Sequence, residues 1–362
     1  MEFAHVVCVV LGVCSPFLAV FLLFLAIHHY RNRSYCASQK HGNGGGAGTG
    51  SREEVVAEAE KLVTFPGGED LTSQAILDAP GEVVARSSHG TLYRAWLGGE
   101  GSPVSLRFVR PECVGTAREV LQAAQLLGLV RHPNLVPLRA LYVGSHGEKL
   151  LVQPYFPGGT LFHFLNDGSL ESHRWEVIHK LSLGIAKALD HLHNGLQRPL
   201  VHGGLNTSNI LLGADQQPHL SAFGLHLLLN TSSAQEVLEE SAVMGYKAPE
   251  LIKMKDVSKE SDVYSFGVIL LEMVTRKEPR GGLLPAMDVH LSNSSTDSAF
   301  DCEVPEMLGS GLITQTERQS CKLTEQGLLM FFQLALACCA FSPSSRPGIR
   351  QVLRKLETIG CR

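Results

Sequence analysis

The chain has 362 residues, of which 44% are hydrophobic and 18% are charged, and its formal net charge is -4. This length suits a two-lobed unit with tails, and the basic residues form no stripe of the kind that nucleic-acid-binding proteins carry. The nine cysteines have no CxxC spacing, which argues against a zinc site or a disulfide scaffold and favours a reducing compartment.

The first element in chain order is an apolar run near the N-terminus. Val6 to Ile27 is 22 residues without a charged side chain, enough for a helix to cross a hydrocarbon core of about 30 Å. A buried core helix and a cleaved signal peptide are the alternatives. No Lys or Arg precedes the run, and it is longer than the apolar part of a signal peptide, so we predict a transmembrane helix over residues 6–27.

Charges beside this run predict its orientation. Only Glu2 precedes it, whereas Arg31, Arg33 and Lys40 follow it closely. Because basic residues stay on the cytoplasmic side, residues 1–5 are expected outside the cytoplasm and the rest of the chain inside it. Residues 28–70 are expected to be a juxtamembrane linker, since residues 41–50 are dominated by glycine and cannot bury enough surface to fold.

Beyond the linker, the sequence predicts strands first and helices later. The strand pattern is an alternation of apolar and polar residues, or a short apolar run, and the helix pattern is an apolar face of period 3.6. Residues 281–325 are rich in Gly, Ser and Asp and predict a loop insertion. Strands are expected at 104–108, 135–141 and 149–153, and helices at 175–193, 263–274, 328–340 and 349–359.

The most informative stretch is Leu200 to Gly224, LVHGGLNTSNILLGADQQPHLSAFG. It contains a His, an Asn seven residues later, an apolar run, a turn, and Phe-Gly. This order resembles the catalytic and metal-binding loops of protein kinases, H-R-D-L-x-x-x-N and D-F-G. Residues 61–97 also resemble the start of the kinase domain in plant leucine-rich-repeat receptor-like kinases. No leucine-rich repeats are expected, because only five residues precede the apolar run.

The resemblance implies an α+β, bilobal protein-kinase-like fold preceded by one transmembrane helix. The β-rich N-lobe is expected over residues 71–155 and the helical C-lobe over residues 156–362. The implied location is the plasma membrane, as a single-pass protein with its kinase-like domain in the cytoplasm.

The same resemblance implies that the groups of the phosphoryl-transfer reaction are missing. Gly204 stands at the position of the base that accepts the substrate's proton, and Ala222 at the position of the aspartate that holds magnesium. Arg107 replaces the lysine of the third kinase strand, and Gln125 is placed at the glutamate of the following helix, so the ion pair between these positions would become a weaker hydrogen bond. Arg is bulkier than Lys and planar, so it does not replace a compact ammonium group.

Nucleotide binding is left open by the sequence. Two of the three loop glycines are replaced, by Ala85 and Ser87, and only Gly90 remains, which a turn between strands explains without any ligand. The adenine-binding backbone groups would be those of Pro154 and Phe156, after Gln153 at the gatekeeper position. A weakly bound nucleotide, without magnesium, would contact Gly90, Arg107, Pro154, Phe156 and Asn209.

The structural landmarks of the resemblance are present. Ala248-Pro249-Glu250 matches A-P-E, and Arg346 is expected to pair with Glu250. Asp262 is expected to bind the backbone near His202. Four polar residues, Thr231, Ser232, Ser233 and Ser241, lie where the activation loop is expected.

Three functional hypotheses follow. The favoured one is a membrane-anchored pseudokinase that binds receptor or cytoplasmic kinases, with no catalytic residue, no metal and no cofactor. The second is a weakly active serine/threonine kinase in which Asn209, with a carboxylate such as Asp215, holds a metal. The third is an ATP-binding nucleotide sensor.

Overall fold

The computed structural model describes residues 60–98, 102–145, 147–168, 172, 174–254, 256–279 and 325–360. These residues belong to one compact unit, Ala57–Arg362. The predicted transmembrane helix over residues 6–27 and nearly all of the predicted loop insertion lie outside them. Within the described ranges, no helix is long and apolar enough to span a bilayer.

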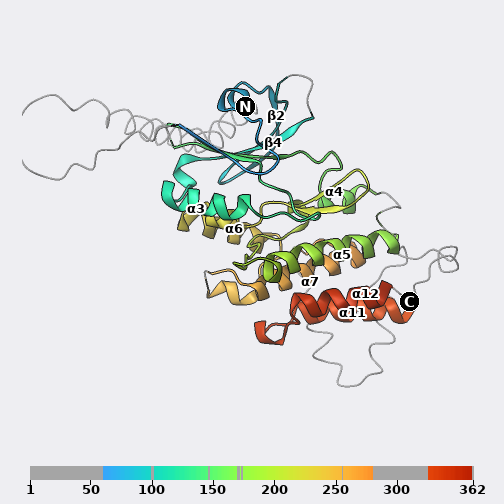
Figure 1. Ribbon diagram of the computed structural model, residues 1–362. Helices are drawn as coiled ribbons and strands as arrows, with labels where there is room; N and C mark the ends of the chain where they lie inside the picture. Colours follow the sequence, from blue (N-terminus) through green and yellow to red (C-terminus); the bar gives the residue numbers. More distant parts are fainter. Residues whose placement is uncertain are drawn as a thin grey trace, which may run out of the picture. The chain divides into compact units, whose positions relative to one another are not determined.

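The N-lobe is an antiparallel six-stranded sheet in the order β1-β5-β6-β4-β3-β2. Figure 1 shows the sheet above the helices of the C-lobe. The first strand lies inside the range predicted as linker and pairs with β5, so the sheet begins earlier than the predicted boundary at residue 71. The strands are β1 Lys61–Thr64, β2 Gly81–Ser87, β3 Gly90–Ala95, β4 Val104–Val109, β5 Ala140–Val143 and β6 Lys149–Pro154.

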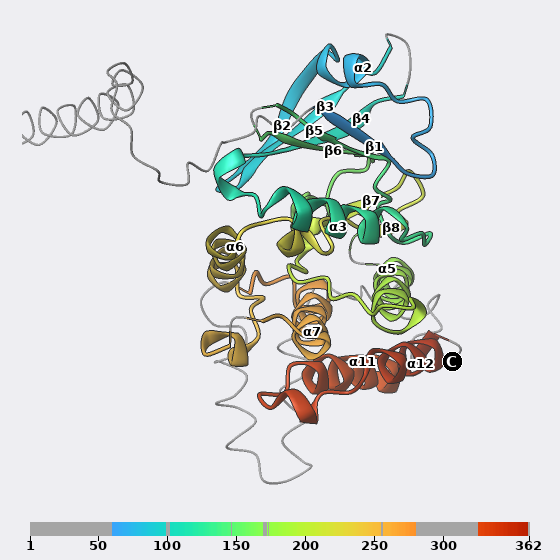
Figure 2. The ribbon, with the colours of Figure 1, turned by 60° about the vertical axis from the view of Figure 1, so that its left-hand side comes forward.

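Each face of this sheet packs against a helix because the side chains of a strand alternate between faces. Val104 and Leu106 of β4 pack with Ile76 of α2 (Ser73–Leu77). On the opposite face, Val109 joins the core that contains the buried side of α3 (Ala117–Gly128). Figure 2 shows α3 beneath the sheet, between the two lobes.

The stretch predicted as a strand from Leu135 to Leu141 is mostly irregular. Only its last two residues belong to β5, and Leu135 makes an isolated parallel bridge with Leu220. Pro137 interrupts the run, and proline has no backbone N–H for a strand ladder. The apolar side chains are nevertheless buried, which explains why the pattern resembled a strand.

The C-lobe is helical, with a small hairpin of β7 (Ile210–Leu212) and β8 (Pro218–Leu220) facing the N-lobe. Its central helix α7 is buried almost along its whole length, as its continuous apolar sequence predicts. The α-helices are α4 Leu161–Asn166, α5 Trp175–Asp190, α6 Thr231–Val243, α7 Lys259–Thr275, α11 Glu325–Cys338 and α12 Ile349–Gly360. Short 3-10 turns are η1 Pro111–Cys113, η4 Thr207–Asn209, η5 Leu225–Leu227, η6 Pro249–Ile252 and η7 Pro343–Ser345, and a π turn, η3 His191–Gly195, extends α5.

The expected two-lobed arrangement is therefore present. The catalytic-loop and metal-loop positions lie on the segments flanking the β7–β8 hairpin, on the side of the C-lobe that faces α3.

Candidate functional site

A buried aspartate from α7 holds the loop that would carry the catalytic base. Asp262 is 2% exposed and accepts hydrogen bonds from the backbone N–H groups of His202 (2.7 Å) and Gly203 (3.0 Å). Its Oδ2 also lies 2.8 Å from Nε2 of His193. Burial alone would raise the pKa of Asp262, but the hydrogen bond from His193 and the backbone donors lower it. The predicted contact between Asp262 and the backbone at His202 is confirmed.

The imidazole of His202 is fully buried behind this loop. Burial lowers its pKa to about 4, although the nearby Asp262 carboxylate acts in the opposite direction. Neither ring nitrogen has a hydrogen-bond partner among the described residues. The ring of His226 lies close by, since a Cβ added to Gly203 would come within 2.3 Å of its Nδ1. His202 is thus a neutral side chain of the core.

The base position offers no acceptor in this structure. A Cβ added to Gly204 would meet only Val237 of α6 within 4 Å, at 3.8 Å from Cγ1. Asn209, seven residues after His202, donates its side-chain amide to the Gly204 carbonyl (2.8 Å). That amide therefore supports the loop backbone. Asp215, considered as a rescuing metal ligand, instead lies in the β7–β8 turn, where its exposed carboxylate is 3.9 Å from Lys180.

Ala222, at the magnesium position, has an unusual backbone. Its φ is 60°, in the left-handed region that costs a residue with a Cβ about 1 kcal/mol or more. Aspartate and asparagine tolerate this region better than alanine does. The following Phe223 is buried, and the Gly224 N–H donates to the His202 carbonyl (3.0 Å). The backbone thus keeps a shape that suits an aspartate, while the side chain is a methyl group.

Arg107 and Gln125 do not meet. Arg107 lies on the same face of β4 as Val109, toward α3, and burial lowers the pKa of its guanidinium group. Gln125 is exposed on α3, whose buried positions in that turn are Ala123 and Ala124. Among the described residues, no hydrogen bond or ion pair joins the side chains of Arg107 and Gln125. The hydrogen bond expected between these positions is therefore absent, because the sequence register placed Gln125 on the wrong side of the helix.

The loop that would cover nucleotide phosphates is closed by its own side chains. Gly90 begins β3, where a Cβ would come within 2.0 Å of the Phe108 carbonyl oxygen, so close strand packing requires this glycine. His89 at the tip of the loop is only 5% exposed, and its Nε2 lies 3.2 Å from Oγ of Ser87. The Ser87 carbonyl in turn accepts from Arg110 (3.1 Å). His89 was not predicted; the sequence feature that could have indicated it is an imidazole between Ser87, at a replaced glycine position, and the retained Gly90.

The hinge positions lie where they were predicted. Pro154 ends β6, and Phe156 follows it in the connection between lobes. The Phe156 ring packs against the His219 ring of β8 with centroids 4.2 Å apart. This contact joins the hinge to the β7–β8 hairpin, which is a structural role for the residue.

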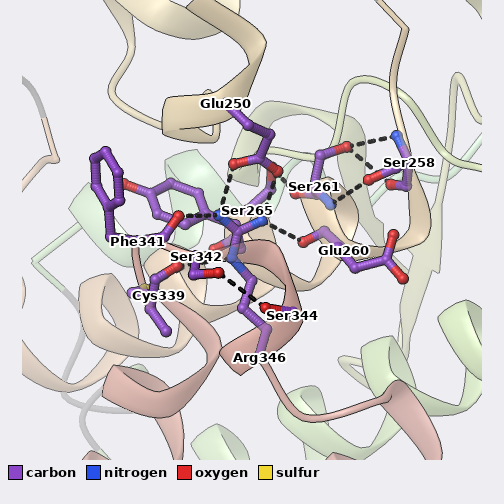
Figure 3. A network of polar contacts seen from close by, with 12 residues as sticks. Glu250, Ser258, Glu260, Ser261, Ser265, Cys339, Phe341, Ser342, Ser344 and Arg346 are labelled. Atoms are coloured by element: carbon purple, nitrogen blue, oxygen red, sulfur yellow. Dashed lines mark hydrogen bonds and ion pairs between the residues drawn. The ribbon is translucent and has the colours of Figure 1, made fainter. Parts of the chain in front are cut away.

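The Glu250–Arg346 pair is present and fastens the lower part of the C-lobe (Figure 3). Both terminal guanidinium nitrogens donate to the carboxylate at 2.6 Å. The same guanidinium donates to the carbonyls of Ala340 (2.8 Å) and Glu260 (2.9 Å). The Arg346 side chain is 0% exposed. Burying its charge would be costly, but the guanidinium group has a carboxylate partner and carbonyl acceptors that compensate this cost.

A second buried polar cluster was not predicted. The hydroxyl of Tyr246 donates to Glu272 of α7, and Oγ1 of Thr207 lies 2.8 Å from the same hydroxyl. Burial raises the pKa of the Glu272 carboxyl to about 7. The sequence feature that could have predicted this cluster is Glu272, a single carboxylate inside the apolar run of α7. The cluster joins the catalytic-loop segment to the segment before Glu250.

The predicted activation loop contains a helix. Residues 231–243 form α6, which begins after the capping side chain of Asn230, and Ser233 and Ser241 on it are buried. Thr231 and Ser232 are exposed. No group of three or more His, Cys, Asp or Glu side chains suited to a metal ion occurs in the described ranges.

Comparison with known proteins places these features in a family. Residues 81–356 match the model of the family "Protein tyrosine and serine/threonine kinase". The "Putative kinase-like protein TMKL1" of Arabidopsis thaliana is 36% identical over 323 residues, covering 85% of this chain and 46% of that protein. A "Probable inactive receptor kinase" of the same plant is 33% identical, covering 86% of this chain and 47% of that protein. The chain thus spans about half the length of these relatives.

Two solved structures have the same fold. The kinase domain of maize SIRK1 (sucrose-induced receptor kinase 1), bound to AMP-PNP, has a TM-score of 0.68 and 27% identity, covering 83% of this chain and 99% of that one. The pseudokinase domain of BIR2, described as an immune regulator, has a TM-score of 0.61 and 26% identity, covering 80% of this chain and 82% of that one. This chain belongs to the protein tyrosine and serine/threonine kinase family and is related, within it, to plant receptor-like kinases.

Proposed function

We propose that this chain is a receptor-like pseudokinase that transmits signals by binding other kinases and does not transfer phosphate. The observation that carries the proposal is the base position. Gly204 has no side chain, and the nearest side chain to the space in front of it is the apolar Val237. General base catalysis needs a proton acceptor within hydrogen-bond reach of the substrate hydroxyl.

The metal position supports the same proposal. Ala222 has no ligand atom, and Asn209 uses its amide on the Gly204 carbonyl. Phosphoryl transfer depends almost entirely on positioning and on the charge that Mg²⁺ neutralises. Loss of the base and the magnesium ligand together leaves the chain without the means for that reaction, which argues against a weakly active kinase.

The preserved contacts explain how a domain without catalytic groups would keep the fold that partner binding requires. The Asp262, Glu250–Arg346 and Tyr246–Glu272 contacts join segments inside the C-lobe and stabilise its fold. Fold-stabilising contacts that persist without catalytic groups are what a binding domain requires. The names of several relatives, "Probable inactive receptor kinase", and the pseudokinase neighbour accord with this role.

The place of action that we propose is the cytoplasmic face of the plasma membrane. The support is the apolar run at residues 6–27 and the basic residues that follow it. A flexible linker after such an anchor would raise the local concentration of the domain beside membrane-bound kinases. The nucleotide-sensor alternative is disfavoured by the buried His89 in the phosphate-binding loop.

The test is a binding and activity assay with the purified full chain and the cytoplasmic domain of an active plant receptor kinase. We expect a complex with micromolar affinity and a change of twofold or more in the autophosphorylation rate of the active kinase. The Gly204→Ala variant is the matched control, because its new Cβ makes only an ordinary contact with Val237. It should bind equally well. If a panel of active receptor kinases shows neither a complex nor a change in rate, the proposed function is wrong.

A further inference from the structure

We propose that the contact between the two lobes at His132 and His191 is a proton-sensitive joint, which is stable while both imidazole rings are neutral and weakens when one of them takes up a proton. His132 lies in the segment that connects α3 to β5, and His191 begins η3 at the end of α5. Figure 2 shows the end of α3 and the β7–β8 hairpin above α5. The joint does not depend on whether the chain binds another kinase, so a negative result here leaves the proposed function untouched.

The rings of His132 and His191, here called the stacked pair, face each other between the lobes. Their centroids are 5.0 Å apart, and their planes differ by 26°. Both side chains are half-buried, and Nε2 of His191 is enclosed without a hydrogen-bond partner among the described residues. Neutral rings in such a stack attract each other by dispersion, whereas two imidazolium rings would repel each other. The stack therefore favours neutral rings.

A backbone hydrogen bond also requires an unprotonated nitrogen on His132. The Asn134 N–H donates to Nδ1 of His132 (3.1 Å). Because both nitrogens of an imidazolium ring carry protons, a charged His132 could not accept this bond. Asn134 is only 5% exposed, and a buried donor without an acceptor is costly. Protonation of His132 would therefore destabilise the turn over residues 132–135.

The same turn attaches the N-lobe to the β7–β8 hairpin. The Asn134 side-chain amide donates to the Pro218 carbonyl (2.9 Å), and the Asn134 carbonyl accepts from the Leu220 N–H (2.9 Å). The Val136 N–H donates to the Leu220 carbonyl (2.9 Å). Because β8 leads into the metal loop, a weakened turn would also loosen the strand that precedes this loop.

Positive charges beside the stacked pair oppose its protonation. Burial lowers the pKa of His132, and His191 and Lys187 of α5 lower it further. The guanidinium group of Arg131 donates to three backbone carbonyls and adds a positive charge to the same turn. Because the ordinary pKa of histidine is about 6.5, an opened turn binds a proton more readily than the closed turn below that pH. The joint is therefore complete above about pH 6.5 and weakens as the pH falls.

The other charged groups near the stacked pair do not explain a loss of contact in acid. Asp190 of α5 pairs with Arg350 of α12 (3.2 Å). Burial lowers the pKa of His219 in β8, whereas the Asp215 carboxylate and a hydrogen bond to the Pro133 carbonyl raise it. A protonated His219 would bind that carbonyl more strongly. The stacked pair is therefore the group whose protonation weakens the turn.

Hydrogen exchange of the purified full chain at about pH 7.5 and about pH 5.5 tests the joint. The readout is the protection factor, which removes the effect of pH on the intrinsic exchange rate. Amides of residues 134–136 and 219–221 should lose about fivefold to tenfold of their protection at the lower pH, as expected for one lost hydrogen bond.

The His132→Asn variant removes the proton and keeps the acceptor. An asparagine oxygen accepts from the backbone N–H two residues further on and does not titrate in this range. Protection in this variant should stay within about twofold between the two pH values. The matched control is His163→Asn at an exposed position of α4, which should show the same loss as the wild type. All these proteins retain His202 and Glu272, so the effects of those groups on global stability cancel in the comparison.

A second variant tests the stack itself. His191→Phe keeps an aromatic ring against His132 but cannot carry a charge, so its loss of protection should be smaller than that of the wild type. An equal loss in His191→Phe and the wild type would contradict the role of the stacked pair. The joint is also not proton-sensitive if the wild type keeps its protection at the lower pH, or if His132→Asn loses as much as the wild type does.

Discussion

At the scale of single residues, the metal loop keeps its backbone conformation but lacks the side chain that would bind a metal. Ala222 keeps φ at 60°, and Gly224 keeps its bond to the His202 carbonyl, so the metal loop has its form without a ligand atom. Gly204 and Ala222 could be read from the sequence because their neighbours His202, Asn209 and Phe223 fix the register. The strained backbone at Ala222 could not, since alanine rarely adopts it.

The burial of His202 predicts how stability depends on pH. Its pKa is about 4 in the folded protein and about 6.5 when exposed, so between these values the unfolded chain binds the additional proton. The contribution of His202 to the free energy of unfolding is fully present above pH 6.5 and decreases as the pH falls toward 4. Glu272 acts in the opposite direction, because its carboxyl, with a pKa of about 7, stays protonated in the fold below that pH.

The His202→Leu variant separates the effect of His202 on stability from the opposing effect of Glu272. Leucine at position 202 loses no hydrogen bond among the described residues, because both ring nitrogens lack partners. Between about pH 7.5 and pH 4.5 the wild type should lose about 2–3 kcal/mol more stability than His202→Leu. Urea unfolding at several pH values measures this. Parallel stability curves for the two proteins would show that His202 is not buried in its neutral form.

At the scale of elements, the Glu250–Arg346 pair predicts a large effect of one substitution. Glu250→Gln leaves a fully buried guanidinium group without its carboxylate, which should lower the free energy of unfolding by about 3 kcal/mol. The matched control is Glu176→Gln in the exposed Arg174–Glu176 pair, whose side chains are 46% and 66% exposed. It should cost less than about 1 kcal/mol. Denaturant titration of both variants tests this, and equal losses would contradict the structural role of the buried pair.

Elements also show where sequence patterns mislead. The Glu250–Arg346 and Asp262–His202 contacts were predicted correctly because these residues lie in motifs whose spacing fixes their positions in the fold. Gln125 was misplaced because neighbouring helix positions point in different directions, so a small error of register moves a residue from the buried to the exposed face. The helix α6 was missed because its apolar periodicity is weak and its contacts with Cys113 and Glu112 are distant in sequence.

At the scale of the whole molecule, two lobes and a central buried helix were predictable, whereas the packing of residues 225–243 against the N-lobe and the catalytic-loop segment was not. This packing places Leu228 beside Val109 of β4 and Val237 beside Gly204, and these residues show no common pattern in the sequence. Their meeting is a result of tertiary packing. The predicted membrane span at residues 6–27 stays a prediction.

The central claim is that this kinase fold carries out no phosphoryl transfer, and the most direct test is incorporation of labelled phosphate. The purified full chain is incubated with γ-labelled ATP, Mg²⁺ and a general protein substrate. The account predicts no incorporation above a protein-free blank, for the wild type and for Asn209→Ala alike. Incorporation by the wild type that Asn209→Ala abolishes would contradict it.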